Sequence, residues 1–365
     1  NHKYAFFPSV AAAWRVSEED FLKGSRTISN LKLRISYGST GNSEIGQYQS
    51  IGGLSSNTAI FGGTRAGGEV QGTIPNPNLK WEKTDQTDLG VDLGLFNNRI
   101  NLTADVYNKI TTGLLLYAPV PLSSGFDNVL TNIGSVRNRG FELGLNTYNL
   151  VGDFKWNTTL NFSANRNKIL ALGLHNEDIF PGPGFLDQTN ILRVGQPVGS
   201  CYGLTRLGTW STAEAAQAAE VGAKPGDIKD SATKSILGHA YPDFTSEFIN
   251  RFSYKNFELV VDIQISQGNS VLNLAYATSE DRQTLANSYA TVLNAWTPSN
   301  QNTSIAQVRL NGDGPSLRQD SHYVQDGSFI RGKNIALSYN VPKSLCSQLH
   351  VSNLRLFTGV QNAFL

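Results

Sequence analysis

The feature that most restricts the fold of this chain is an alternation of apolar and polar residues that recurs in long runs. Successive side chains of a β-strand point to opposite faces of a sheet, so this period indicates strands with one apolar and one polar face. In residues 154–165 and 257–266, apolar residues occupy nearly every second position. Shorter runs of the same kind lie at 31–38, 88–95, 100–107, 141–146, 335–341 and 354–360. The sequence therefore predicts an all-β protein.

The lengths of the strands and of their connections favour a membrane protein. The two longest runs exceed the average globular strand of about five or six residues and match the roughly nine to eleven needed to cross a bilayer at a tilt. Short connections alternate with long ones, as in membrane barrels with tight turns at one end and large loops at the other. The short ones are Asn97-Asn98, Val151–Asp153 and Lys255-Asn256, and the long ones are roughly 41–83, 111–133, 167–198 and 268–327. We therefore expect a transmembrane antiparallel β-barrel whose apolar faces contact lipid and whose polar faces contact water.

Two structural questions stay open at the level of sequence. A soluble sandwich or propeller also has alternating strands, although its strands are shorter and its turns recur about every 8–12 residues. Between 199 and 240 the up-and-down order of strands lacks one crossing. Either a short strand lies near Asp227–Lys229, or residues 199–208 belong to a loop. Residues 212–221 are rich in Ala and predict a short helix.

The composition argues against several classes of function. Lys and Arg number 30 against 29 Asp and Glu, without a run of five like charges, so nucleic acid is not an expected partner. Cys201 and Cys346 form no CxxC motif and are either two unpaired thiols or one disulfide. The five histidines form no zinc-binding pair, and Ser231–Lys234 has an SxxK spacing without its companion motifs. We expect no catalytic residues, no cofactor and no metal site.

Ordered segments of the chain carry a resemblance to a known family. The first is FFPSVAAAWRVSEEDF at residues 6–21, and others are Leu31–Asn42, Pro75–Thr84, Leu95–Ile100, Gly134–Glu142, 195–199, 224–228, 326–335 and 354–362. Together they resemble the SusC/RagA family of TonB-dependent outer-membrane transporters over essentially the whole chain. The continuation Lys229–Thr233 departs from the family, because it is not the Asp-, Asn- and Gly-rich stretch expected of a calcium loop. No metal site is therefore carried over.

The resemblance implies a location in the bacterial outer membrane and a role in transport. Family barrels have about 22 strands, with a plug domain inside and an N-terminal segment that contacts TonB. We expect residues 1–365 to be part of one barrel domain, with about eleven or twelve of those strands and without the plug or N-terminal extension. The implied function is import of an oligosaccharide or peptide with a SusD-like surface lipoprotein, energised through the TonB complex.

Loop aromatics are the candidate substrate-binding residues. Tyr48, Phe126, Phe185, Tyr276 and Trp296 lie among Asn, Asp, Gln and Gly in the expected loops. Aromatic rings stack on sugar faces or peptide side chains, while amides and carboxylates bond hydroxyls. The same rings would also serve to pack loops together or to form an interfacial girdle. The alternative function is an adhesin or structural barrel without transport, and a barrel enzyme with catalytic loop residues is a third hypothesis.

Overall fold

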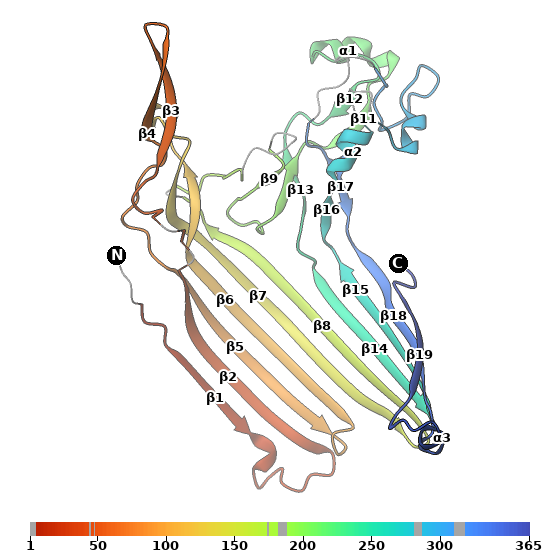
Figure 1. Ribbon diagram of the computed structural model, residues 1–365. Helices are drawn as coiled ribbons and strands as arrows, with labels where there is room; N and C mark the ends of the chain where they lie inside the picture. The colour runs from red at the N-terminus through yellow and green to blue at the C-terminus, as the bar shows by residue number, and fades with distance from the viewer. Residues whose placement is uncertain are drawn as a thin grey trace.

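The main element of the structure is an antiparallel sheet that forms a tall curved wall (Figure 1). The computed structural model describes residues 5–43, 45–46, 48–173, 175–181, 188–280, 287–309 and 318–365. Within these residues the wall has ten strands, and chain neighbours in the wall are hydrogen-bonded neighbours in space. They are β1 (Ser9–Arg15), β2 (Ile28–Asn42), β5 (Glu82–Leu95), β6 (Ile100–Pro119), β7 (Asn128–Val151), β8 (Phe154–Ala171), β14 (Phe244–Tyr254), β15 (Phe257–Gln267), β18 (Phe329–Asn340) and β19 (Arg355–Gln361). The all-β prediction is confirmed.

Smaller elements lie beyond the two ends of the wall (Figure 1). The upper end carries the hairpin of β3 (Leu54–Phe61) and β4 (Thr64–Gln71) and the helices α1 (Ala215–Glu220) and α2 (Leu274–Ser279). It also carries three small sheets. The first consists of β9 (Asn190–Ile191), β10 (Ser200–Gly203) and β13 (Ser235–His239), the second of β11 (Arg206–Thr209) and β12 (Ile228–Asp230), and the third of β16 (Ser270–Leu272) and β17 (Val324–Asp326). The lower end carries α3 (Lys343–Gln348). Among the described residues, no helix is both long enough and apolar enough to cross a membrane.

Tight turns join the strands at the lower end of the wall. β5 and β6 are joined by residues 96–99, β7 and β8 by 152–153, and β14 and β15 by 255–256, as the short connections predicted. Asn97, Asn98 and Lys255 have φ values of 56°, 59° and 49°. This left-handed region is required in tight hairpins and is tolerated best by Gly and Asn.

Cross-strand register gives the wall one apolar and one polar face. One row across the apolar face consists of Ile35, Leu89, Val106, Phe141 and Ala164, and the next row towards the lower end consists of Leu33, Val91, Ala104, Leu143 and Phe162. Ile35 and Leu89 are 54% and 50% exposed. Near the lower turns the same face carries the aromatic pairs Phe154–Phe252, Trp156–Phe252 and Phe257–Tyr339. An apolar band edged by aromatic residues is typical of a barrel surface in contact with lipid.

In two of the expected loops, strands of the wall continue well beyond their predicted ends. Within 111–133, β6 continues to Pro119 and β7 begins at Asn128, so the connection is only 120–127. Gly113, with φ of 66°, lies unpaired at a bulge that lets the strands continue beyond it. Likewise β8 continues to Ala171, beyond the predicted end of its strand at 166.

Residues 199–208 belong to the loop region and do not form a strand of the wall. Ser200–Gly203 pairs with β13 and β9 outside the wall, and β8 pairs directly with β14. A short strand does exist at Ile228–Asp230, but it pairs with β11 in the loop region. The Ala-rich stretch forms α1, preceded by a 3-10 turn at Thr212–Glu214. The wall consequently has ten strands in the described residues, one or two fewer than the eleven or twelve expected.

Candidate functional site

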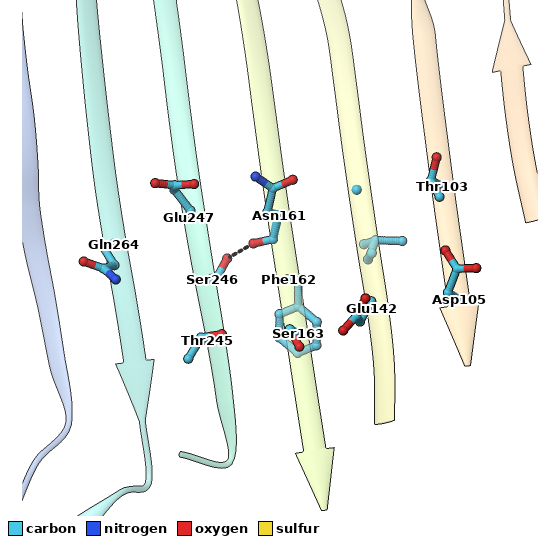
Figure 2. A pocket seen from close by; sticks show the side chains of 12 residues that line it. Thr103, Asp105, Glu142, Asn161, Phe162, Ser163, Thr245, Ser246, Glu247 and Gln264 are labelled. Carbon is cyan, nitrogen blue, oxygen red and sulfur yellow. Dashed lines mark hydrogen bonds between the residues drawn. The ribbon is translucent and has the colours of Figure 1, made fainter. Parts of the chain in front are cut away.

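The polar face of the wall contains an open hollow of about 470 Å³. Its polar side chains come from five neighbouring strands, because alternate residues of each strand point to this face. They are Thr103 and Asp105 on β6, Glu142 on β7, Asn161 and Ser163 on β8, Thr245 and Glu247 on β14, and Gln264 on β15 (Figure 2). Among the described residues, three carboxylates and no basic side chain line this hollow, and cations outside the lining bond two of the three carboxylates. The third carboxylate leaves a negative charge that attracts cationic groups.

A second hollow of about 700 Å³ adjoins the first and shares Asp105 and Glu142 with it. Arg34 and Lys109 are the cations in its lining, and two carboxylates hold the side chain of Arg34. Arg34 Nη2 lies 3.0 Å from Asp92 Oδ1 and 2.9 Å from Asp105 Oδ1, and Arg34 Nε donates to Asp92 Oδ2 at 3.0 Å. Charge-assisted bonds of this kind fix the guanidinium in place.

Glu142 differs from the other carboxylates of the hollow. It lies directly opposite Asp105 in the register of β6 and β7. Arg34 bonds Asp105 and Lys333 bonds Glu247 at 2.5 Å, whereas Glu142 makes no hydrogen bond or ion pair within the described part of the chain. Like charges directly opposite each other repel. The carboxylate of Glu142 at the shared edge of the two hollows can therefore attract a bound cationic group.

The loops at the upper end form a folded unit held by buried polar contacts. Arg206 and Asp320 pair at 2.6 Å, with side chains only 3% and 1% exposed. Asp320 also accepts from the backbone N–H of His322 at 2.8 Å, and the Arg206 guanidinium lies 5.0 Å from the ring centroid of Tyr323. This pair joins the loop that follows β8 to the loop that precedes β17.

Tyr276 lies at the edge of the same unit. Its ring is 5.5 Å from that of Tyr289 and 5.6 Å from that of His322. His322 Nε2 lies 2.5 Å from Oε2 of Glu280, a residue that also accepts from Thr291. The ring of Tyr276 is half-buried and Tyr289 is 44% exposed, so this aromatic group combines packing with an accessible surface.

The other predicted substrate-binding residues lie in different environments. Trp296 is 4% exposed and packs inside the loops beside Gly226. Phe126 lines a pocket of about 190 Å³ together with Tyr117, Gln49 and Asn128, and Tyr48 is 78% exposed. Phe185 lies outside the described residues. The structure thus distributes the predicted aromatics over the upper end, and their contact with a substrate stays a prediction.

Sequence reasoning missed the acidic hollow. Asp105, Glu142 and Glu247 lie on three strands and share no local motif, although Asp105 and Glu142 belong to the polar side of the alternating runs at 100–107 and 141–146. The polar positions of the alternating runs were the only sign of this hollow in the sequence. Only the register between strands brings the three carboxylates to one place.

Two carboxylates in the loops have lowered pKa values because cations bond them. Arg193 donates hydrogen bonds to both carboxylate oxygens of Asp178 and lowers the pKa of that carboxyl, while the pKa of Arg193 rises. Hydrogen bonds from Lys229 and from the backbone and hydroxyl of Ser211 lower the pKa of Glu214 to about 2. These contacts stabilise the loops at neutral pH.

The two cysteines are unpaired, which is one of the two alternatives that the sequence leaves open. Cys201 and Cys346 are both buried free thiols, and burial raises the pKa of Cys201. Among the described residues, no group of three or more His, Cys, Asp or Glu side chains is arranged to hold a metal ion.

Comparison with known proteins places the chain in a family. The family described as TonB dependent receptor-like, beta-barrel matches residues 1–363. TonB-dependent receptor P3 of Formosa agariphila is 38% identical over 384 residues, which cover 99% of this chain and 37% of the relative. TonB-dependent receptor SusC of Bacteroides thetaiotaomicron is 28% identical over 100% of this chain and 37% of its own length. The chain thus spans well under half the length of these relatives.

The solved structures agree in fold. The RagAB peptide transporter matches with a TM-score of 0.79 and 27% identity, over 99% of this chain and 40% of the other. The same fold is found in the RagAB peptide importer in its closed-closed and open-open states, each with a TM-score of 0.79. This family consists of transporters and receptors, which agrees with the non-enzyme prediction. The chain belongs to the TonB-dependent receptor β-barrel family, is similar to its SusC and RagA members, and is located in the bacterial outer membrane.

Proposed function

We propose that residues 1–365 are part of the barrel domain of an outer-membrane importer of oligomeric nutrients, either glycans or peptides. The observation that carries the proposal is a polar, acid-lined hollow on the inner face of a wall whose outer face is apolar. The family supports it, because RagAB is a peptide importer and SusC is a TonB-dependent receptor. In a barrel completed by strands from outside this chain, the hollow would lie along the path of the substrate.

The energy and the partners of import would come from outside this chain. We propose that a plug closes the barrel, that the TonB complex supplies energy, and that a SusD-like surface lipoprotein captures substrate at the upper end. The upper end suits this role because it carries the large loops, the exposed hairpin β3–β4 and the accessible aromatics around Tyr276. Tyr48, Phe126, Phe185 and Tyr276 remain the proposed substrate-contacting residues, whereas Trp296, only 4% exposed, is proposed to support the loops by packing.

Growth and uptake test the proposal in the native bacterium. Cells that lack the gene should fail to deplete one class of oligomer, peptide or glycan, from a defined mixture followed by mass spectrometry. The full-length gene should restore depletion, and a tagged full-length protein should retain a surface lipoprotein on purification. If deletion leaves depletion of every oligomer unchanged while adhesion to a surface is lost, the protein is an adhesin.

Substitution of Glu142 tests the role of the hollow separately. Glu142→Gln removes one carboxylate that has no partner in the described residues, so the fold should be retained while uptake of cationic oligomers falls severalfold. Asp153→Asn, at the exposed lower turn, is the matched control for charge. If Glu142→Gln and Asp153→Asn support equal uptake of cationic oligomers, the hollow does not lie on the path of the substrate.

A further inference from the structure

A square of four basic side chains lies on the apolar face of the wall, just above the apolar band. Arg139 is directly opposite Arg166, and Arg137 is directly opposite Lys168, in the register of β7 and β8. Adjacent strands lie about 4.8 Å apart and alternate residues of one strand about 6.7 Å apart. The backbone positions of these four cationic residues therefore lie within one small patch. This basic square consists of Arg137, Arg139, Arg166 and Lys168.

The register places the basic square at the upper boundary of the apolar band. The row directly below it contains Val106, Phe141 and Ala164. The row that contains Arg139 and Arg166 continues through polar Asn108 and Thr87 on β6 and β5. In a barrel whose large loops are extracellular, this boundary coincides with the headgroups of the outer leaflet.

Most of the charge in the basic square is unmatched by the described residues. Arg166 pairs with Asp243. Arg137, Arg139 and Lys168 make no hydrogen bond or ion pair within the part of the chain that the structure describes, and Nε of Arg137 is buried without a partner. Asp85 lies in the same row as Arg137 but two strands away, with Ile110 between them. Its carboxylate is paired with Lys83. Like charges opposite each other are destabilising, so a bound anion would relieve the repulsion.

We propose that the basic square is a binding site for the phosphate of an anionic glycolipid in the outer leaflet. Arg binds phosphate through two parallel hydrogen bonds, and Lys adds a point charge. The acyl chains of the same lipid would lie against the band below, where the rings of Phe141 and Phe162 are 6.3 Å apart. A free anion would need only the upper part of this surface, whereas an amphipathic lipid matches both the basic square and the apolar band. The site is independent of the transported nutrient.

The test measures lipid retention by the full-length protein in detergent. The protein, freed of lipid, is titrated with diphosphorylated lipid A, and the bound lipid is counted by native mass spectrometry. Arg139→Gln with Lys168→Gln removes two exposed cations that have no partner in the described residues. Retention should weaken about thirtyfold, the size expected for two cationic side chains near an anionic headgroup. Added salt should weaken retention by the unsubstituted protein.

A matched control separates this site from general charge. Arg65→Gln with Lys23→Gln removes the same charge from exposed positions on the β3–β4 hairpin and in the β1–β2 connection, and it should retain lipid as the unsubstituted protein does. Equal loss in both double variants would overturn the proposal. So would equal retention of dephosphorylated lipid A, or saturation of the site by inorganic phosphate without retention of lipid. An unchanged shift on heating in gel electrophoresis establishes that each variant is folded.

Discussion

At the scale of single residues, the buried pair of Arg206 and Asp320 has the largest expected effect on the loops. Both side chains are almost completely buried, and Asp320 also bonds the backbone of His322. Removing one partner leaves a buried charge unpaired, which costs about 3–5 kcal/mol. The loops above the wall depend on this pair because it joins segments more than a hundred residues apart in the chain.

The first prediction concerns this pair. Asp320→Ala should lower the free energy of local unfolding of the loops by about 3–5 kcal/mol, measured by hydrogen exchange at residues 204–209 and 320–326. The wall should keep its protection, because the pair lies outside it. Replacing both partners, as Arg206→Met with Asp320→Leu, should restore much of the loss. Equal protection in Asp320→Ala and the unsubstituted protein would show that the pair does not hold the loops.

The second prediction concerns Glu214, whose pKa is lowered to about 2 by Lys229 and Ser211. A carboxyl with a lowered pKa in the folded state stabilises the loop above its ordinary pKa of 4.5, and this stabilisation is lost as the pH falls towards 2. Cleavage by pepsin within 211–230, expressed as a ratio to the cleavage of Glu214→Gln at the same pH, should therefore increase as the pH falls from 5 to 2. The variant supplies the reference because it lacks the titrating group. A constant ratio over this pH range would contradict the prediction.

At the scale of elements, the alternation of each strand assigns every side chain to lipid or to the interior. Leu143 lies in the second row of the apolar face, and Asn161 points to the polar face beside Glu247. The same substitution should therefore destabilise the barrel at Leu143 and have little effect on its stability at Asn161. The reason is that arginine is strongly disfavoured in the hydrocarbon region and is favoured next to a carboxylate in a wet interior.

The third prediction follows from this assignment. Leu143→Arg should destabilise the barrel by about 2–4 kcal/mol, whereas Asn161→Arg should leave its stability within about 1 kcal/mol. The measurement is the denaturant midpoint of the full-length protein folded into lipid vesicles. If the two variants lose equal stability, the two faces have been assigned incorrectly.

At the scale of the whole molecule, the wall is open. Within the described residues, β1 and β19 each have a neighbour on one side only. The N–H and C=O groups of a free strand edge have no water to bond inside a bilayer. We therefore expect strands from outside residues 1–365 to pair with both edges in the membrane, which fits the 37% of SusC that the chain spans.

The fourth prediction tests this requirement. A polypeptide limited to residues 1–365 should not insert into vesicles as a protease-resistant barrel, because its two strand edges stay unpaired. The full-length protein should insert and should migrate differently in gels before and after heating. Resistance of residues 1–365 to protease in vesicles would point to closure by association of copies.

The sequence predicts most of the wall strands, the tight turns and the membrane location. Alternation along each run depends only on the period of a β-strand, and Asn97 and Asn98 mark a turn because Asn tolerates the left-handed backbone conformation. The tertiary structure alone decided that β8 pairs with β14 across the intervening loop and that 111–133 is mostly strand. It also decided that the three carboxylates of the hollow and the four cations of the basic square each share a patch. The physical reason is that strand pairing is non-local: the register between strands, which no short segment encodes, sets the neighbours of each side chain.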